Sequence, residues 1–182
     1  MKSYARYKDS EVSWIGEIPT EWSLKRIKHV AITYTGNSIS DDEKSQYEDN
    51  IDAYPYISSK DITLGSGAIN YDNGMFTPKN NKNFRIATRH CTLVCIEGGS
   101  AGKKIAYLTK DVSFVNKLCC FYGISIYPRF LSFYLQSDSF AEEFKLNISG
   151  MIGGVNKGEL KNFSIVVPEF NEQISVAAYL DR

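Results

Sequence analysis

Short apolar stretches separated by turn residues fill the middle of the chain. Four of them are rich in β-branched and aromatic residues and are bounded by Gly, Asn and Asp: AYPYISSKDITL (53–64), CTLVCIE (91–97), KIAYLT (104–109) and KLCCFYGISI (117–126). Runs of this length and composition are typical of β-strands. The pattern therefore predicts a β-rich core between residues 53 and 126.

Helical spacing begins at Pro128. PRFLSFYLQ (128–136) opens with a proline suited to a first helical turn, and SFAEEFKL (139–146) pairs Ser139 with Glu142 in a capping box. A glycine-rich loop (147–160) and a strand, KNFSIVVP (161–168), come next. The order predicts an α+β fold in which short helices pack on the β-rich part.

The last helix predicted is EFNEQISVAAYLDR (169–182), with Ile174, Ala177 and Ala178 on one face. Residues 1–27 show neither the alternation of a strand nor the spacing of a helix, and we expect them to be irregular. A chain of 182 residues is enough for one ordinary core. We therefore expect a single domain over 1–182, whose amphipathic last helix needs a surface to pack against.

The composition leads to expectations about the location of the protein and about the role of its cysteines. No apolar run approaches the roughly 18 residues needed to cross a bilayer, and the first ten residues lack the apolar part of a signal peptide, so we expect a cytoplasmic protein without a membrane partner. All four cysteines lie in apolar stretches, as small buried residues do. A zinc site is the alternative. The spacing of zinc ligands in known sites is fitted poorly by Cys91, Cys95, Cys119 and Cys120, so we expect no metal.

The charge is zero overall but uneven along the chain. Residues 79–117 hold eight basic side chains and two acidic ones, a local charge of +6: Lys79, Lys82, Arg85, Arg89, Lys103, Lys104, Lys110 and Lys117 against Glu97 and Asp111. This asymmetry fits a face that binds a polyanion. It fits equally a solvated face balanced elsewhere.

The known catalytic motifs do not match. A phosphate loop ending at Gly102-Lys103 would need glycine where Glu97 stands and a hydroxyl where Lys104 stands, and a strand rather than a helix follows. The dinucleotide, serine-hydrolase and zinc-protease motifs are also missing. A nuclease set of Asp138, Glu143 and Lys145 would lie on one predicted helix, where a solvated face is the simpler reading. We expect no enzyme activity and no cofactor.

The composition of the two glycine loops suits the binding of a phosphate-containing ligand. EGGSAGKK (97–104) and SGMIGGVNKG (149–158) each combine glycine, small polar residues and lysine, a mixture that lets a backbone approach phosphates closely. Composition alone leaves flexible turns as the alternative.

The order of several stretches resembles a target recognition domain from the specificity subunit of type I restriction-modification systems. The matching stretches are YKDSEVSWIGEIPTEWSLKRIKHVA, YPYISSKDI, CIEGGSAGKKIAYL, VSFVNKLCCF, RFLSFYLQS and ISGMIGGVNKGELKNFSIVVPEFNEQISVAAYLD. They cover nearly the whole chain. Two turns depart from the family pattern: Cys91-Thr92 replaces the usual Gly-Asp, and Pro168-Glu169-Phe170 replaces Pro-Pro-Leu.

The resemblance implies a non-catalytic subunit that reads one half of a split site in double-stranded DNA. Its partners would be the modification and restriction subunits and a second recognition domain, or a second copy paired through the last helix, of which 169–182 would be the start. Whether the chain is a fragment, a truncated product or a half-subunit stays open. So does a scaffold that binds the modification subunit with little affinity for DNA; a stand-alone nuclease is the third alternative.

Positively charged side chains would position the DNA by its phosphates, and amide, hydroxyl or amino groups would read base edges. The phosphate candidates are Arg85, Arg89, Lys103, Lys104, Lys117, Lys157 and Lys161. The base-reading candidates are Ser58, Ser59, Lys60, Ser100, Asn116 and Asn156, although loop Ser and Asn also cap turns. For the aromatic residues Tyr54, Tyr56, Phe121 and Tyr122, and for Trp14 and Trp22, we favour packing over stacking on bases or holding a partner.

Overall fold

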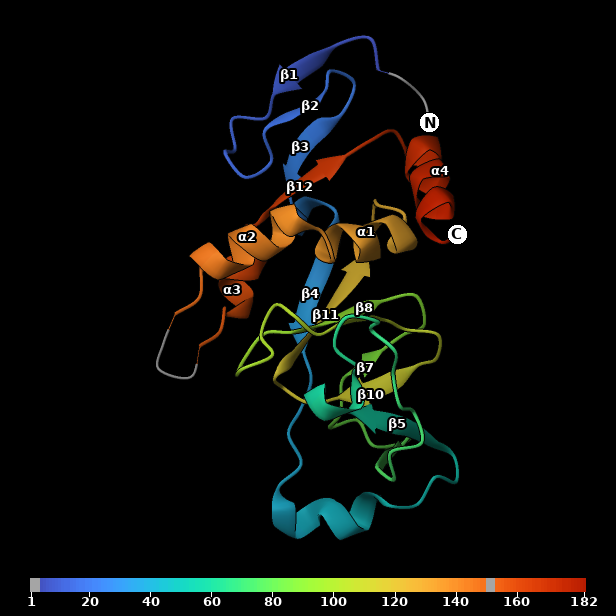
Figure 1. Ribbon diagram of the computed structural model, residues 1–182. Helices are drawn as coiled ribbons and strands as arrows, with labels where there is room; N and C mark the ends of the chain where they lie inside the picture. Colours follow the sequence, from blue (N-terminus) through green and yellow to red (C-terminus); the bar gives the residue numbers. More distant parts are fainter. Residues whose placement is uncertain (1–3, 150–152) are drawn as a thin grey trace.

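The first and last thirds of the chain are joined by short antiparallel strands. The computed structural model describes residues 4–149 and 153–182 (Figure 1). β1 (Tyr7–Asp9) pairs with β2 (Glu17–Pro19), and β3 (Ser23–Arg26) pairs with β12 (Ser164–Val167). The expectation of an irregular segment over 1–27 was therefore wrong for residues 7–9, 17–19 and 23–26, since strands of three or four residues are too short to show a period.

A four-stranded antiparallel sheet lies at the centre, in the order β4 (Ala31–Thr35), β11 (Leu118–Gly123), β8 (Thr92–Cys95) and β9 (Ile105–Tyr107). Three of these strands lie inside stretches that the sequence predicted, and the prediction of a β-rich core is confirmed. β8 and β9 are the two strands that the first glycine loop connects.

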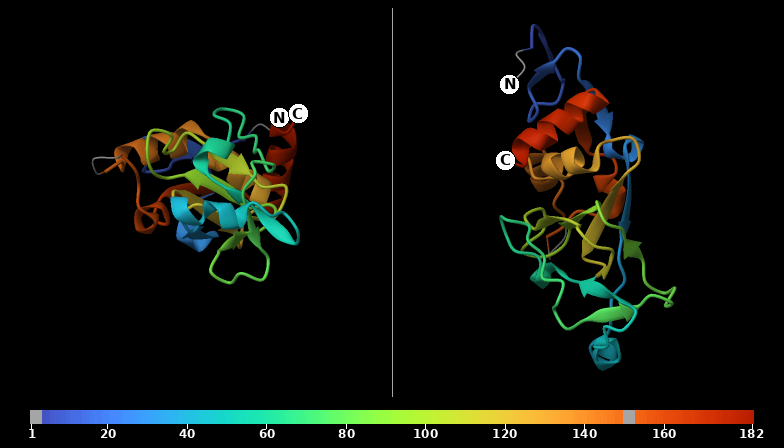
Figure 2. Two further views of the ribbon diagram at one scale, coloured as in Figure 1. Left: turned by 90° about the horizontal axis from the view of Figure 1, so that it is seen from below. Right: turned by 90° about the vertical axis from the view of Figure 1, so that its right-hand side faces the viewer.

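A second sheet covers one face of the first. Its order is β6 (Phe76–Pro78), β5 (Ala53–Ile57), β10 (Val112–Phe114) and β7 (Ile86–Ala87), with β10 parallel to β5. The 3-10 segment η2 (Asp41–Tyr47) lies at the far end of the elongated molecule, opposite the N-terminal strands (Figures 1 and 2). Among the strands of this sheet, β5 was predicted, whereas β6, β7 and β10, of two or three residues each, were not.

Two apolar clusters lie on the two faces of the central sheet. Cys119 and Phe121 of β11 belong to the cluster under the helices, whereas Leu118 and Cys120 belong to the cluster under the second sheet. Side chains alternate along a strand, so a strand covered on both sides must be apolar throughout. All four cysteines are buried free thiols, as predicted.

In the part of the chain that the structure describes, four α-helices complete the α+β fold: α1 (Pro128–Leu135), α2 (Asp138–Leu146), α3 (Lys157–Leu160) and α4 (Phe170–Leu180). Pro128 occupies the first turn of α1, as predicted. The N-cap of α2 is Ser137, which accepts a bond from the N–H of Phe140; the predicted capping box of Ser139 with Glu142 was wrong. No helix in the described part of the chain is long and apolar enough to cross a membrane.

Several side chains differ from expectation in their exposure. On α4, Ala177 is buried, but Ile174 is 39% exposed and Ala178 is exposed; Gln173 takes the inward position instead. Gln173 Oε1 accepts the backbone N–H of Tyr127, and its Nε2 donates to the carbonyl of Pro168, which explains why a polar side chain is tolerated there.

The exposure of Glu143 and of Tyr122 also differs from the prediction. Glu143 is 5% exposed, not on a solvated face, and both its carboxylate oxygens accept the backbone N–H of Ser164. Burial raises the pKa of this carboxyl. Tyr122 is 45% exposed beside Ile32, its partner across the strands, whereas Tyr56 and Phe121 pack in the interior as expected.

Candidate nucleic-acid interface

The two glycine loops, far apart in the sequence, lie against each other. Gly98 N–H donates to the carbonyl of Gly153 at 3.0 Å, and Val155 N–H donates to the carbonyl of Ile96 at 3.0 Å. Glu97 and Gly154 form an isolated antiparallel bridge between these two bonds. Residues 150–152 of the second loop lie outside the described part; residues 153–155 are paired to the first loop, and Ser149 is paired to Gly154 of its own loop. Together the loops form one surface.

The first loop is a hairpin connection with a fixed base. Cys95 N–H donates to the carbonyl of Lys104 at 2.9 Å, and Gly102 N–H donates to the carbonyl of Cys95 at 2.8 Å. Gly102 has φ +72°, and a Cβ there would meet the ring of Phe144 at 2.6 Å. Gly98 and Gly99 face open space. The base of the loop is thus packed against α2, and its tip is accessible.

Lysines border this pair of loops. Lys103 is exposed and Lys104 half-buried within the first loop, and Lys117 joins the loop through its carbonyl, which accepts Ile96 N–H at 3.0 Å. Burial raises the pKa of the Cys95 thiol, while the positive charges of Lys104 and Lys117 oppose that rise. The backbone bonds of Lys104 to Cys95 and of Lys117 to Ile96 place both lysines at the base of the first loop.

Lys157 belongs to the same group through the second loop. It begins α3 directly after Asn156, and the preceding Val155 is paired with the first loop. Burial raises the pKa of the Cys119 thiol to about 12, and the charge of Lys157 opposes this rise. Of the seven predicted phosphate contacts, the structure therefore gathers Lys103, Lys104, Lys117 and Lys157 around the glycine loops.

A short turn from another part of the chain adjoins the first loop. Ser58 caps the 3-10 turn η3 (Ser59–Asp61): its N–H and hydroxyl both donate to Asp61 Oδ2, at 2.8 and 2.6 Å. Lys104 Nζ donates to the carbonyl of Ser59 at 2.7 Å. Asp61 was not among the predicted site residues, although the spacing Ser-x-x-Asp is a capping signature that could have identified it.

The predicted base-reading residues fall into three groups. The Ser58 hydroxyl and the Asn156 side chain are engaged as caps, the latter accepting Glu159 N–H at 3.1 Å. Lys60 and Asn116 are exposed, and the side chains of Lys60, Ser100 and Asn116 make no hydrogen bond to any described residue. Ser59 meets Lys104 through its backbone.

The remaining basic candidates lie elsewhere. Arg85 Nη1 donates to the carbonyl of Thr35 at 3.1 Å, and Arg89 N–H donates to Asp111 Oδ1 at 2.7 Å. Lys161 is the C-cap residue directly after α3, and its carbonyl accepts Lys28 N–H at 2.8 Å. The positively charged window of the sequence is accordingly divided among several surfaces.

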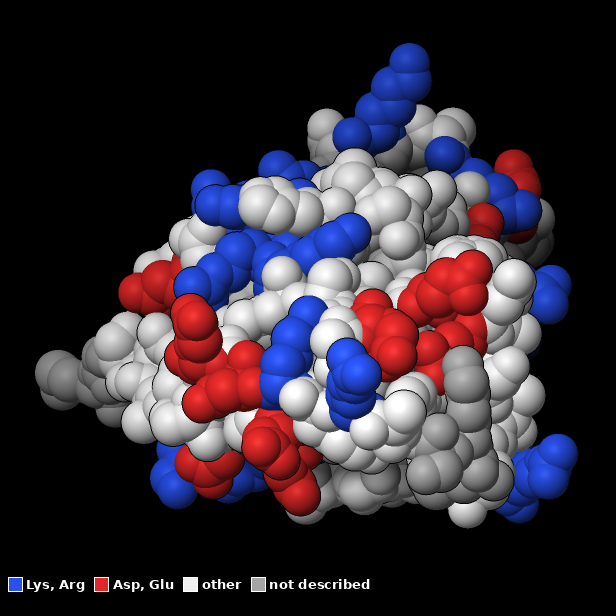
Figure 3. Space-filling model, turned by 90° about the horizontal axis from the view of Figure 1, so that it is seen from above, with Lys and Arg blue, Asp and Glu red and all other residues white. Residues whose placement is uncertain are grey.

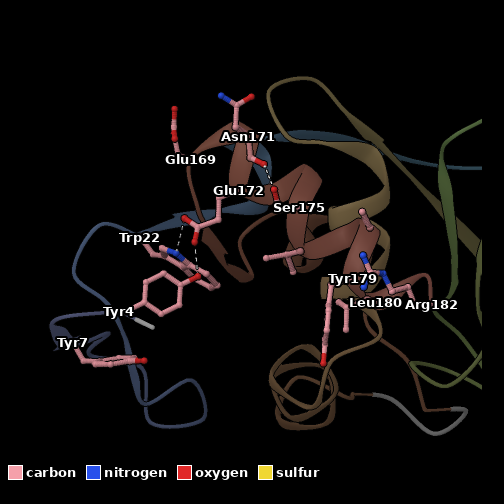
Figure 4. A pocket seen from close by; sticks show the side chains of 12 residues that line it. Tyr4, Tyr7, Trp22, Glu169, Asn171, Glu172, Ser175, Tyr179, Leu180 and Arg182 are labelled. Atoms are coloured by element: carbon pink, nitrogen blue, oxygen red, sulfur yellow. Dashed lines mark hydrogen bonds between the residues drawn. The ribbon is translucent and has the colours of Figure 1, made fainter. Parts of the chain in front are cut away.

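A separate surface lies at the end of the molecule that β1–β3 and α4 form (Figure 1). Seen from the side of β1–β3 and α4, basic and acidic side chains alternate over the surface (Figure 3). A groove of about 1050 Å³ opens between the N-terminal segment and α4 (Figure 4). Glu172 of α4 binds two residues of the N-terminal segment: Tyr4 Oη donates to one of its oxygens, and Trp22 Nε1 donates to the other at 3.2 Å. Trp22 therefore packs on the apolar cluster under the helices and also ties the N-terminal segment to α4.

Comparison with known proteins gives a consistent picture. Residues 19–182 match the model of the type I restriction modification DNA specificity domain. No curated protein sequence matches the chain. The fold is shared with the S subunit of the type I restriction-modification system from M. genitalium (TM-score 0.62, 17% identity, 88% of this chain and 38% of that one).

Two further solved structures share the fold. One is the HsdS subunit from Thermoanaerobacter tengcongensis (TM-score 0.65, 19% identity, 90% of this chain and 37% of that one). The other comes from work on complex assembly and conformational transition of the type I R-M system (TM-score 0.69, 20% identity, 90% and 38%). This chain thus spans well under half the length of the solved chains that it matches.

Proposed function

The chain belongs to the family of type I restriction-modification DNA specificity domains, and from this premise we propose that it recognises one half of a bipartite sequence in double-stranded DNA. It acts as a non-catalytic component in the cytoplasm. Methyl transfer and cleavage belong to the modification and restriction subunits, its protein partners. Residues 1–182 act as one recognition domain, and the other half-site is read by a second domain or by a second copy paired through α4.

The paired glycine loops support this proposal most directly. They present an accessible backbone, with no side chain on Gly98 or Gly99 to keep a ligand away, and lysines stand on several sides of it. A phosphate chain needs close approach and positive charge, and such a surface offers both. The absence of a matching nucleotide motif in the same loop favours DNA over a mononucleotide.

Positioning and reading are assigned to different side chains. Lys103, Lys117 and Lys157 contact phosphates around the loops, and Arg85, Arg89 and Lys161 serve only DNA that extends past them. The exposed Asn116 and Lys60, with Ser100 on the loop, are the first choices for base edges, because amide, amino and hydroxyl groups can reach into the major groove. Ser58 and Asn156 contribute by shaping the turns that they cap.

Selection from a randomised pool of DNA duplexes tests the proposal. The full chain is incubated with the pool at moderate salt, alone and with a modification subunit, and bound duplexes are sequenced. Enrichment of a short half-site, even only with the subunit present, is the expected result. If the subunit binds but no sequence is enriched in either arm, the chain is a scaffold and the proposal is wrong.

A further inference from the structure

We infer that Lys103 and Lys104, consecutive in the sequence, serve DNA recognition differently: Lys103 binds a phosphate, whereas Lys104 is a positioning residue that holds the Ser58–Asp61 turn in place for base reading. This assignment rests on the proposed function and deepens it. It moves Lys104 out of the group of phosphate contacts that its charge alone suggested.

The surroundings of Lys104 carry the first half of the assignment. Its ammonium group donates to the carbonyl oxygen of Ser59 at 2.7 Å, a short bond for a charged donor. The main chain of Lys104 closes the base of the glycine hairpin through the bond from Cys95 N–H. With both its backbone and its side chain fixed, Lys104 joins the hairpin to a turn from another part of the chain.

The turn that Lys104 holds is internally well defined. Asp61 is buried, and its carboxylate accepts both the N–H and the hydroxyl of Ser58. On the far side, Asp61 is fixed by its carbonyl, which accepts Asn70 N–H at 2.9 Å. Lys60, between these fixed points, projects into solvent. The bond from Lys104 therefore sets where the exposed Lys60 lies relative to the glycine loop.

Lys103 has the opposite surroundings. It is exposed, and its ammonium group has no hydrogen-bond or ion-pair partner among residues 4–149 and 153–182. Within the same described part, the backbone N–H groups of Gly99 and Ser100, on the tip of the loop, have no acceptor. Adjacent free N–H groups beside a lysine suit an anionic oxygen. A DNA phosphate is the anion that this site would meet.

The two roles predict different losses of DNA affinity when each lysine is replaced. A phosphate contact contributes the same amount to every DNA sequence and about 0.9 to the slope of log affinity against log salt. A residue that positions a base-reading element contributes to the affinity for the preferred sequence and contributes little to the affinity for other sequences. Comparing a selected duplex with a scrambled one, over a range of salt, separates these effects.

The experiment measures both duplexes with wild type, Lys103→Met, Lys104→Met, Lys104→Arg and Ser58→Ala. Lys103→Met should weaken both duplexes equally and lower the salt slope by about one. Lys104→Met should weaken the selected duplex about tenfold while leaving the scrambled duplex within about twofold, as loss of one base contact does. Lys104→Arg, which keeps a charged donor, should restore most of the selectivity.

Ser58→Ala tests the same turn without changing charge. It removes the hydroxyl bond to Asp61 and should reproduce the loss of selectivity seen in Lys104→Met. If Lys104→Met weakens both duplexes equally, as Lys103→Met does, or if Ser58→Ala leaves selectivity intact, the assignment of Lys104 is overturned. If wild type itself prefers no sequence, the proposed function fails before the variants are compared.

Discussion

The backbone N–H of Gly98 donates to the carbonyl oxygen of Gly153, and this 3.0 Å bond joins two loops that the sequence places far apart. Gly154 continues the contact: a Cβ at this position would lie 2.7 Å from the carbonyl oxygen of Ile96. The loops can approach each other this closely only because position 154 has no side chain.

Gly154→Ala should therefore separate the loops and weaken DNA binding. We expect a loss of about tenfold or more in affinity, equivalent to about 1.4 kcal/mol, with the overall fold retained. Ser175→Ala is the control, because Ser175 is exposed on α4, on the other side of the molecule from α3 and the loops (Figure 1). Equal affinities for Gly154→Ala and Ser175→Ala, measured by fluorescence anisotropy, would show that the contact between the loops plays no part in binding.

Asn116 and Asn156 should separate reading from capping. Asn156 accepts Glu159 N–H, so Asn156→Ala should lower the free energy of unfolding by about 1 kcal/mol. Asn116 is exposed, so Asn116→Ala should leave stability within about 0.5 kcal/mol and change which duplexes are selected. Urea unfolding and pool selection provide the two measurements; an unaltered sequence preference for Asn116→Ala would remove this side chain from the base-reading set.

The N-terminal segment should loosen when its bond to α4 is removed. Glu172→Ala takes away the acceptor of both Tyr4 Oη and Trp22 Nε1, and we expect faster amide hydrogen exchange in residues 7–19 (Figure 4). Glu169→Ala is the comparison, since the Glu169 side chain makes no hydrogen bond within the described part of the chain. Equal exchange in both variants would mean that Glu172 does not hold the segment.

Stability should fall in alkaline solution. Burial raises the pKa of Tyr56 and of the Cys119 thiol to about 12, from ordinary values of 10 and 9. Between pH 9 and pH 12 the unfolded chain releases these protons while the folded chain retains them, so the free energy of unfolding decreases as the pH rises. Urea unfolding at pH 9 and pH 11 should show the decrease, and Tyr56→Phe should show a smaller one. An unchanged midpoint at pH 11 would contradict this account.

The parts of the fold that follow from local pattern were accessible from the sequence. β8 and β11 lie between a layer of helices and a second sheet, so they are apolar throughout and stand out as strands. Pro128 likewise marks the start of α1. β7, with two residues, and β1 and β2, with three, carry too little pattern to be recognised.

The candidate site could be predicted only in part from the sequence, for a related reason. Its glycines and lysines are visible as composition, and the family resemblance located them in order. Their grouping depends on long-range backbone contacts, such as Gly98 with Gly153, that leave no mark on either segment. The acceptor of Lys104 is another such case, because nothing in SSKD indicates that the carbonyl of Ser59 faces a lysine forty-five residues later.

Site-specific cross-linking to DNA tests most directly whether the glycine loops are the DNA-reading surface. The four native cysteines are buried, so a cysteine introduced by Ser100→Cys can be labelled selectively with a photoactivatable reagent. Ser175→Cys, exposed on α4, is the control; α3, beside the loops, and α4 lie on opposite sides of the molecule (Figure 1). We predict cross-links to the selected duplex from position 100 and none from position 175. Cross-links from position 175 with none from position 100 would contradict the assignment.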